Sequence, residues 1–86
     1  MPHFVYIIQS EISGIYYKGY TAYPDLRLQE HNDGKSRFTS GKGPWKMVYL
    51  ERLPDKTSAL KREIMLKKAN SAYLRWLINQ EYNLLR

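Results

Sequence analysis

The stretch His3–Thr21, HFVYIIQSEISGIYYKGYT, contains the two segments that decide the fold. Residues 3–10 and 15–20 are both rich in β-branched and aromatic side chains, as β-strands are. Between them lies EISG, which ends in the turn-forming pair Ser13-Gly14. The pattern therefore predicts an antiparallel hairpin.

The segments downstream of the hairpin predict a helix, a third strand and two more helices. Pro24 suits a first helical turn, Gly34 suits a helix end, and Thr57 or Ser58 is the expected N-cap of the next helix. The expected order is β-β-α-β-α-α, which is an α+β fold in one domain, residues 1–86. The expected elements downstream are a helix at 23–34, a Lys- and Gly-rich loop at 35–46, a strand at 46–53, and helices at 56–69 and 71–82. The last helix is expected to have an apolar stripe of Tyr73, Leu74, Leu77 and Ile78. Core positions are expected at Tyr49, Trp76 and Leu77.

Composition narrows the class of partner. The chain has 86 residues and a net charge of +6, from 14 Lys and Arg against 8 Asp and Glu, and such an excess suits a polyanion, most often nucleic acid. There is no cysteine, which excludes disulfides and thiolate metal sites and fits a reducing, cytoplasmic setting. The N-terminal stretch has neither a basic region nor a long apolar run, so we expect no signal peptide and no membrane span.

Two tyrosines of the hairpin are expected on one face of the sheet. If the hairpin closes around residues 11 and 12, Tyr6 lies opposite Tyr17. A register shift of two residues keeps both on that face, and a shift of one separates them. An aromatic pair that only stabilises the sheet, by about 0.2–1 kcal/mol, is the alternative to a functional site.

Three further side chains complete a set that suits phosphodiester chemistry. Arg27 and His31 are spaced i, i+4, and Glu63 borders the apolar stripe of its helix. A carboxylate can hold a divalent metal, an arginine can neutralise phosphate charge, and tyrosine or histidine can move a proton. The alternatives are an exposed basic helix face and an ordinary Glu63–Lys67 helix pair.

The motifs of this chain, taken in order along the sequence, resemble those of the GIY-YIG nuclease superfamily. The first tripeptide is matched by FVY at 4–6 and the second by YKG at 17–19, so Tyr16 is a neighbour without a counterpart. LRLQEHN resembles the family's Arg-x-x-x-His segment, PWKMVYLE its third strand, and ALKREIMLK its metal-site helix. Phe4 and Lys18 depart from the family's glycine and isoleucine. The match spans nearly the whole chain and is closest to the small stand-alone members.

The resemblance implies a three-stranded antiparallel sheet flanked by helices and a metal-dependent DNA endonuclease. It assigns Mg²⁺ or Mn²⁺ to Glu63, the scissile phosphate to Arg27, and the attacking water to Tyr6. Tyr17 would support the metal-bound water or the phosphate, and His31 would assist proton transfer. Selection of substrate by structure rather than by sequence is expected, in a setting such as DNA repair or recombination.

Partners and alternatives complete these expectations. We expect nucleic acid, DNA favoured over RNA, no membrane, and a monomer. A catalytically inactive nucleic-acid-binding module and a protein-interaction domain using the same surface are the alternatives. For the Lys- and Gly-rich loop at 35–46, the alternative to phosphate binding is a solvated, flexible segment. The residues expected to contact phosphates are Lys18, Lys35, Arg37, Thr39, Lys42 and Lys46, with Trp45 near them.

Overall fold

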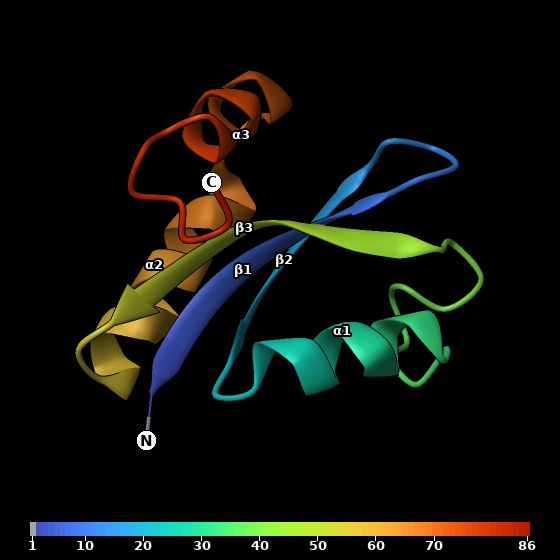
Figure 1. Ribbon diagram of the computed structural model, residues 1–86, viewed down its shortest axis with the longest axis horizontal. Coiled ribbons are helices and arrows are strands. Elements are labelled where there is room, and N and C mark those ends of the chain that lie inside the picture. The colour runs from blue at the N-terminus through green and yellow to red at the C-terminus, as the bar shows by residue number, and fades with distance from the viewer. Residues whose placement is uncertain (1) are drawn as a thin grey trace.

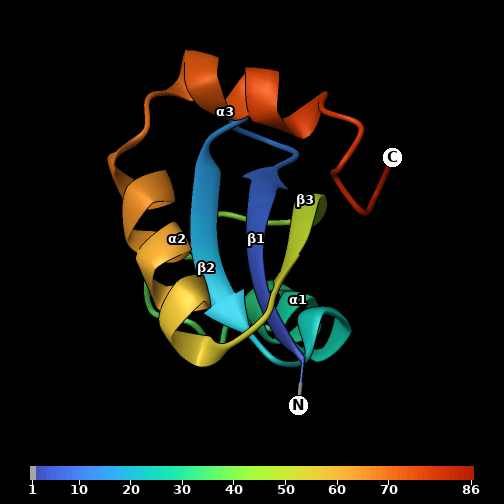
Figure 2. The same ribbon diagram turned by 90° about the vertical axis from the view of Figure 1, so that its left-hand side faces the viewer.

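The computed structural model describes residues 2–86 and confirms the α+β fold: a three-stranded antiparallel sheet with helices on both faces (Figures 1 and 2). The strands lie side by side in the order β2-β1-β3, so β1 is central and β2 is an edge. The chain order is β-β-α-β-α-α, as predicted. The elements are β1 (His3–Ser10), β2 (Tyr16–Thr21), α1 (Pro24–Asn32), β3 (Trp45–Leu53), α2 (Lys56–Lys68) and α3 (Ser71–Ile78).

Several helix ends differ from the sequence prediction. The expected N-cap of α2 at Thr57 or Ser58 is wrong, because the carboxylate of Asp55 accepts the backbone N–H of Ser58 at 2.7 Å and the helix begins at Lys56. Helix α3 ends at Ile78, since the backbone at its C-terminus closes into a tighter turn. Within residues 2–86, none of these helices is long and apolar enough to cross a membrane.

The β1–β2 register is shifted by two residues from the simplest hairpin. Tyr6 pairs with Gly19 and Ile8 pairs with Tyr17. The connection is longer than expected, and a hydrogen bond of 3.0 Å from the Ser10 N–H to the Ile15 carbonyl closes it. A shift of two preserves parity, so Tyr6 and Tyr17 share one face of the sheet, as the sequence predicts.

Each face of the sheet has its own hydrophobic cluster. Side chains alternate along β1, so Val5 and Ile7 pack beneath α2 and α3, while Tyr6 and Ile8 face α1. Complete burial of an aliphatic side chain contributes about 1.5–3 kcal/mol, so the two clusters hold the helices to the sheet. Tyr49 and Leu77 are buried as expected, but Trp76 is not a core residue, because its side chain points outward from α3 and is 53% exposed.

The phenol of Tyr6 lies against the backbone of Gly19 on the neighbouring strand. A Cβ atom at position 19 would come within 2.4 Å of the Tyr6 hydroxyl oxygen and 2.5 Å of Cζ. Real Cβ atoms do not approach other atoms so closely, and Tyr6 is too tightly packed to withdraw. The glycine of the YKG tripeptide is therefore the residue that makes room for the tyrosine of the FVY tripeptide.

We expect Gly19→Ala to lower the free energy of unfolding by about 1–3 kcal/mol, as overpacking of a core does. In a Tyr6→Leu background the same substitution should cost much less, because the ring that meets the new methyl group is absent. Chemical denaturation of the four proteins in this cycle measures the coupling. Equal costs in both backgrounds would show that the Tyr6 ring is not what excludes a side chain at position 19.

Candidate active site

Three side chains from β1, β2 and α1 meet on the face of the sheet that α1 covers. The hydroxyl of Tyr6 lies 2.8 Å from Nε2 of His31. The ring centroids of Tyr17 and His31 are 5.2 Å apart in an edge-on arrangement, and those of Tyr6 and His31 are 5.8 Å apart. His31 is therefore the residue of α1 that both tyrosines contact.

A chain of hydrogen bonds decides which nitrogen of His31 carries the proton. Burial, and then the positive charge of Arg27, lower the pKa of His31 to about 4, so its ring is neutral at pH 7. Nδ1 lies 2.7 Å from the hydroxyl of Thr39, which can donate onward to the Ser36 carbonyl. The arrangement that satisfies every partner has the proton on Nδ1, and Nε2 then accepts a hydrogen bond from the hydroxyl of Tyr6.

Tyr6 lies between a base and a cation but out of reach of solvent. Burial raises its pKa to about 12, although hydrogen bonding and charge from Arg27 oppose the rise. The phenol is thus protonated at pH 7, donates to His31, and accepts from the guanidinium of Arg27. Only 1% of Tyr6 is exposed, so direct contact between Tyr6 and an attacking water does not fit this geometry. Tyr17 is half-buried and is the tyrosine that a substrate can reach.

Arg27 joins the buried part of the site to its open part. It lies one helical turn before His31 on α1, where it meets the Tyr6 phenol inside and forms a 3.2 Å ion pair with Glu30 outside. The side chain of Arg27 remains 32% exposed. Two acceptors hold the guanidinium in place, and enough of it is open for a phosphate oxygen to bind.

Glu63 lies on α2, which packs on the face of the sheet opposite to α1. The negative charge of Glu63 adds to the raised pKa of Tyr6, so the carboxylate acts electrostatically on that phenol. Lys67 forms a 3.5 Å ion pair with Glu63, so the ordinary helix pair considered from the sequence is present. The Glu63 side chain is 18% exposed and that of Lys67 is 51% exposed.

The donor set fits a weakly held hard cation better than a closed metal site. Across residues 2–86, no three histidine, cysteine, aspartate or glutamate side chains lie together as a metal site would require. Glu63 offers one carboxylate, which is partly exposed and paired with Lys67. Mg²⁺ can bind where the protein supplies a single carboxylate, because it retains several waters and takes further ligands from substrate phosphates.

A hollow of about 270 Å³ opens beside these groups and is lined by Tyr17, Lys18, Phe38 and Lys67. Phe38 extends from the loop after α1 and is 69% exposed. Sequence reasoning did not assign Phe38 or Lys67 to the site. An apolar ring in a loop otherwise rich in Lys, Gly and Ser was the available signal for Phe38.

The loop after α1 is anchored rather than free. The Asn32 side chain accepts from the Trp45 backbone N–H at 2.6 Å and donates to the Trp45 carbonyl at 3.0 Å, which closes the loop at its base. Trp45 is buried and donates its indole N–H to the Thr39 carbonyl. Thr39 is only 1% exposed, so its expected contact with a phosphate does not fit, and it supports His31 instead.

The other expected phosphate contacts lie where a polyanion can reach them. Lys18 lines the hollow described above. Four more cations are exposed, three in the loop between α1 and β3 and one at the start of β3: Lys35, Arg37, Lys42 and Lys46.

Comparison with known proteins decides the family. The model of the GIY-YIG catalytic domain matches residues 2–79. The chain belongs to the GIY-YIG family. A UPF0213 protein of Syntrophus aciditrophicus is 38% identical over 80 residues, which cover 91% of each chain. One from Halobacterium salinarum is 35% identical over 71 residues, covering 81% of this chain and 91% of the relative.

A solved structure agrees with the fold of this GIY-YIG protein. The solution NMR structure of the UPF0213 protein BH0048 from Bacillus halodurans has a TM-score of 0.61 and is 30% identical. The similarity covers 99% of this chain and 90% of that one. Membership of the GIY-YIG family supports a nuclease-type activity on nucleic acid, and divalent-metal dependence is general among such nucleases.

We expect the free energy of unfolding to rise with pH between about 4 and 6.5, because the pKa of His31 falls from 6.5 to about 4 on folding. In that window the unfolded chain binds more protons than the folded chain, so acid favours unfolding, by up to roughly 3 kcal/mol. Denaturation at a series of pH values measures the slope. His31→Gln should flatten it and His3→Gln should not, and an unchanged slope in His31→Gln would contradict the assignment.

Proposed function

We propose that this protein hydrolyses phosphodiester bonds in nucleic acid with Mg²⁺ or Mn²⁺, with DNA favoured over RNA. One observation carries the proposal. A partly exposed guanidinium and a half-buried phenol, those of Arg27 and Tyr17, lie beside a buried Tyr6–His31 pair, and the Glu63 carboxylate acts electrostatically on the same Tyr6 phenol. The net charge of +6 suits the polyanionic substrate.

The three open groups have separate roles in this proposal. Glu63 holds the cation, which when bound polarises a phosphoryl oxygen and lowers the pKa of water. Arg27 binds a non-bridging oxygen of the scissile phosphate and neutralises the charge that grows there. Tyr17 contacts the attacking water through its phenol oxygen, which can both donate and accept a hydrogen bond.

Tyr6 and His31 act as positioning residues. The Tyr6 oxygen accepts a hydrogen bond from Arg27, so it fixes where the guanidinium points before the substrate binds. His31 is neutral, and its Nε2, 2.8 Å from the Tyr6 oxygen, accepts the hydrogen bond that Tyr6 donates. A site that is ordered in advance does not need to reorganise during the reaction, and this is the usual source of electrostatic catalysis.

The substrate is selected by shape in this proposal. The expected contacts are lysine and arginine side chains on phosphates, which position a nucleic acid without reading its bases. They are Lys18, Lys35, Arg37, Lys42 and Lys46. Cleavage of branched or nicked substrates in preference to intact duplex would connect the protein to DNA repair or recombination.

The test is cleavage of branched, nicked and single-stranded oligonucleotides with Mg²⁺, Mn²⁺ or EDTA. Glu63→Gln should abolish metal-dependent cleavage and leave nucleic-acid affinity unchanged or slightly higher, because a repelling charge is lost. Arg27→Ala should lower the rate by a factor of roughly 100 or more, the scale for loss of a preorganised charge-stabilising donor. Binding should weaken only modestly, since one phosphate contact among several is removed.

Two exposed positions provide matched controls for these variants. Glu81→Gln, near the C-terminal end, is the control for Glu63→Gln. Arg52→Ala, on β3, is the control for Arg27→Ala. Both control proteins should cleave as the wild type does. Full-rate cleavage by a folded Glu63→Gln protein would place the catalytic centre elsewhere.

A nucleic-acid-binding module without catalysis is the second candidate. The observation that favours it is the ion pair between Glu63 and Lys67, since a cation must displace the lysine from the site's only assigned carboxylate. This candidate predicts no metal-dependent cleavage by the wild type. It predicts salt-dependent binding to duplex, with log K falling against log salt at a slope near −4 to −5 if about 4–6 phosphates are neutralised. A protein-interaction domain predicts a flat salt response.

A further inference from the structure

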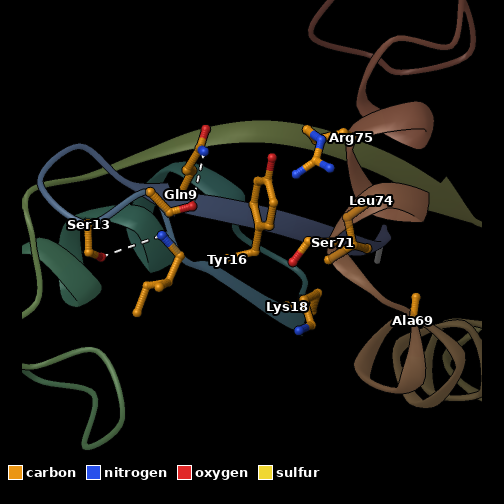
Figure 3. A pocket seen from close by; sticks show the side chains of 10 residues that line it. Gln9, Ser13, Tyr16, Lys18, Ala69, Ser71, Leu74 and Arg75 are labelled. Atoms are coloured by element: carbon orange, nitrogen blue, oxygen red, sulfur yellow. Dashed lines mark hydrogen bonds between the residues drawn. The ribbon is translucent and has the colours of Figure 1, made fainter.

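A second hollow lies on the other side of β2, between that strand, the β1–β2 turn and the start of α3 (Figure 3). Its volume is about 430 Å³, within the usual range of about 300–1,000 Å³ for small-ligand pockets. In Figure 3, Arg75 and Ser71 extend from α3 toward Tyr16 and Lys18 on β2. The lining residues are Gln9, Ser13, Gly14, Ile15, Tyr16, Lys18, Ala69, Ser71, Leu74 and Arg75.

The charge of this hollow is positive and uncompensated. Lys18 and Arg75 are its two charged lining residues, and no aspartate or glutamate lines it. Within residues 2–86, neither cation has an ion pair or a side-chain hydrogen bond. Hydroxyl groups of Tyr16 and Ser71 add neutral hydrogen-bond donors beside them. Such a lining suits a phosphate group, which accepts hydrogen bonds from guanidinium, ammonium and hydroxyl groups alike.

The second hollow is connected to the candidate active site through one residue. Lys18 also lines the hollow that contains Tyr17, Phe38 and Lys67. Tyr16 and Tyr17 are consecutive on β2 and therefore project to opposite faces of the sheet. Because β2 is the edge strand, the two hollows lie on its two sides and meet around its edge at Lys18.

We propose that the hollow at Tyr16, Lys18 and Arg75 binds a backbone phosphate of the same nucleic-acid strand that is cut, within an unpaired stretch beside the scissile bond. This inference rests on the proposed function and specifies its substrate as nucleic acid with a single-stranded flank. A path from one hollow to the other turns around a single β-strand. Duplex DNA, with a persistence length of about 50 nm, does not bend so sharply, whereas a single strand does.

The residues along this path resemble those of surfaces that bind single strands. Such surfaces combine a cationic groove for the backbone with aromatic rings on which bases stack. Cations and aromatic rings are interspersed here, and the Phe38 ring, 69% exposed, is free to stack on an unpaired base. The residues of the path are Phe38, Lys67, Tyr17, Lys18, Tyr16 and Arg75.

The experiment measures binding in EDTA, so that cleavage does not enter the result. The probes are a fluorescent blunt hairpin duplex and the same hairpin with a single-stranded tail of about ten nucleotides. The wild type should bind the tailed probe more tightly than the blunt one. Arg75→Ala should weaken tailed binding about fivefold and lower its salt slope by about 0.7, with blunt binding unchanged. Arg75→Lys should restore most of the loss.

Controls separate this site from general charge and from a site for free anions. Arg52→Ala removes the same charge from exposed β3 and should leave the tailed preference intact. Inorganic phosphate, added at the phosphate concentration of the tailed probe, should not shift the backbone amide NMR signals of Tyr16 and Arg75 as the tail does.

Three results would overturn the inference: no loss of tailed binding in Arg75→Ala, an equal loss for both probes, or an equal effect of Arg52→Ala. Equal NMR shifts with inorganic phosphate would overturn the nucleic-acid strand as the ligand. A different result would refute the proposed function. A wild type that binds the tail through Arg75 and never cleaves with Mg²⁺ or Mn²⁺ would refute the nuclease and leave this binding site standing.

Discussion

The hydrogen bond between Tyr6 and His31 is the interaction on which the rest of the site depends. Both groups are almost completely buried, so each must be paired inside the protein, and an unpaired polar group there costs about 1–3 kcal/mol. The bond joins the central strand to α1. It requires a glycine at position 19, because the phenol occupies the space of a side chain there. It also requires Thr39, which pairs with the far nitrogen of His31 and draws the loop inward.

This constraint divides the site into a fixed half and an open half. Tyr6 and His31 make up the fixed half, and their partners leave them little freedom to move. The open half contains Tyr17 on β2, Arg27 on α1 and Glu63 on α2, each partly exposed. In the proposed function, the Tyr6 phenol positions Arg27 before a phosphate or a cation binds. Strand β2 has a neighbouring strand on one side only, and the proposed path of a nucleic-acid strand around it depends on that edge position.

The sequence was sufficient for the order of elements and for the common face of the tyrosines. The second prediction succeeded although the register was wrong, because a shift of two residues leaves parity unchanged. Burial was harder to predict. Thr39 belongs to a polar loop but is buried by a bond to His31, a contact that no local pattern indicates. Trp76 is apolar yet exposed, since Leu74 and Leu77 already fill the face of α3 that meets the core.

The protonation state of His31 tests the central claim most directly. A long-range ¹H–¹⁵N correlation spectrum at pH 7 distinguishes the two neutral tautomers from the charged ring, and His3→Gln identifies the His31 signals. The account predicts a neutral ring with its proton on Nδ1, because Thr39 accepts from that nitrogen and Tyr6 donates to Nε2. A charged ring, or a proton on Nε2, would contradict it, since Tyr6 would then have lost the acceptor that holds it in place.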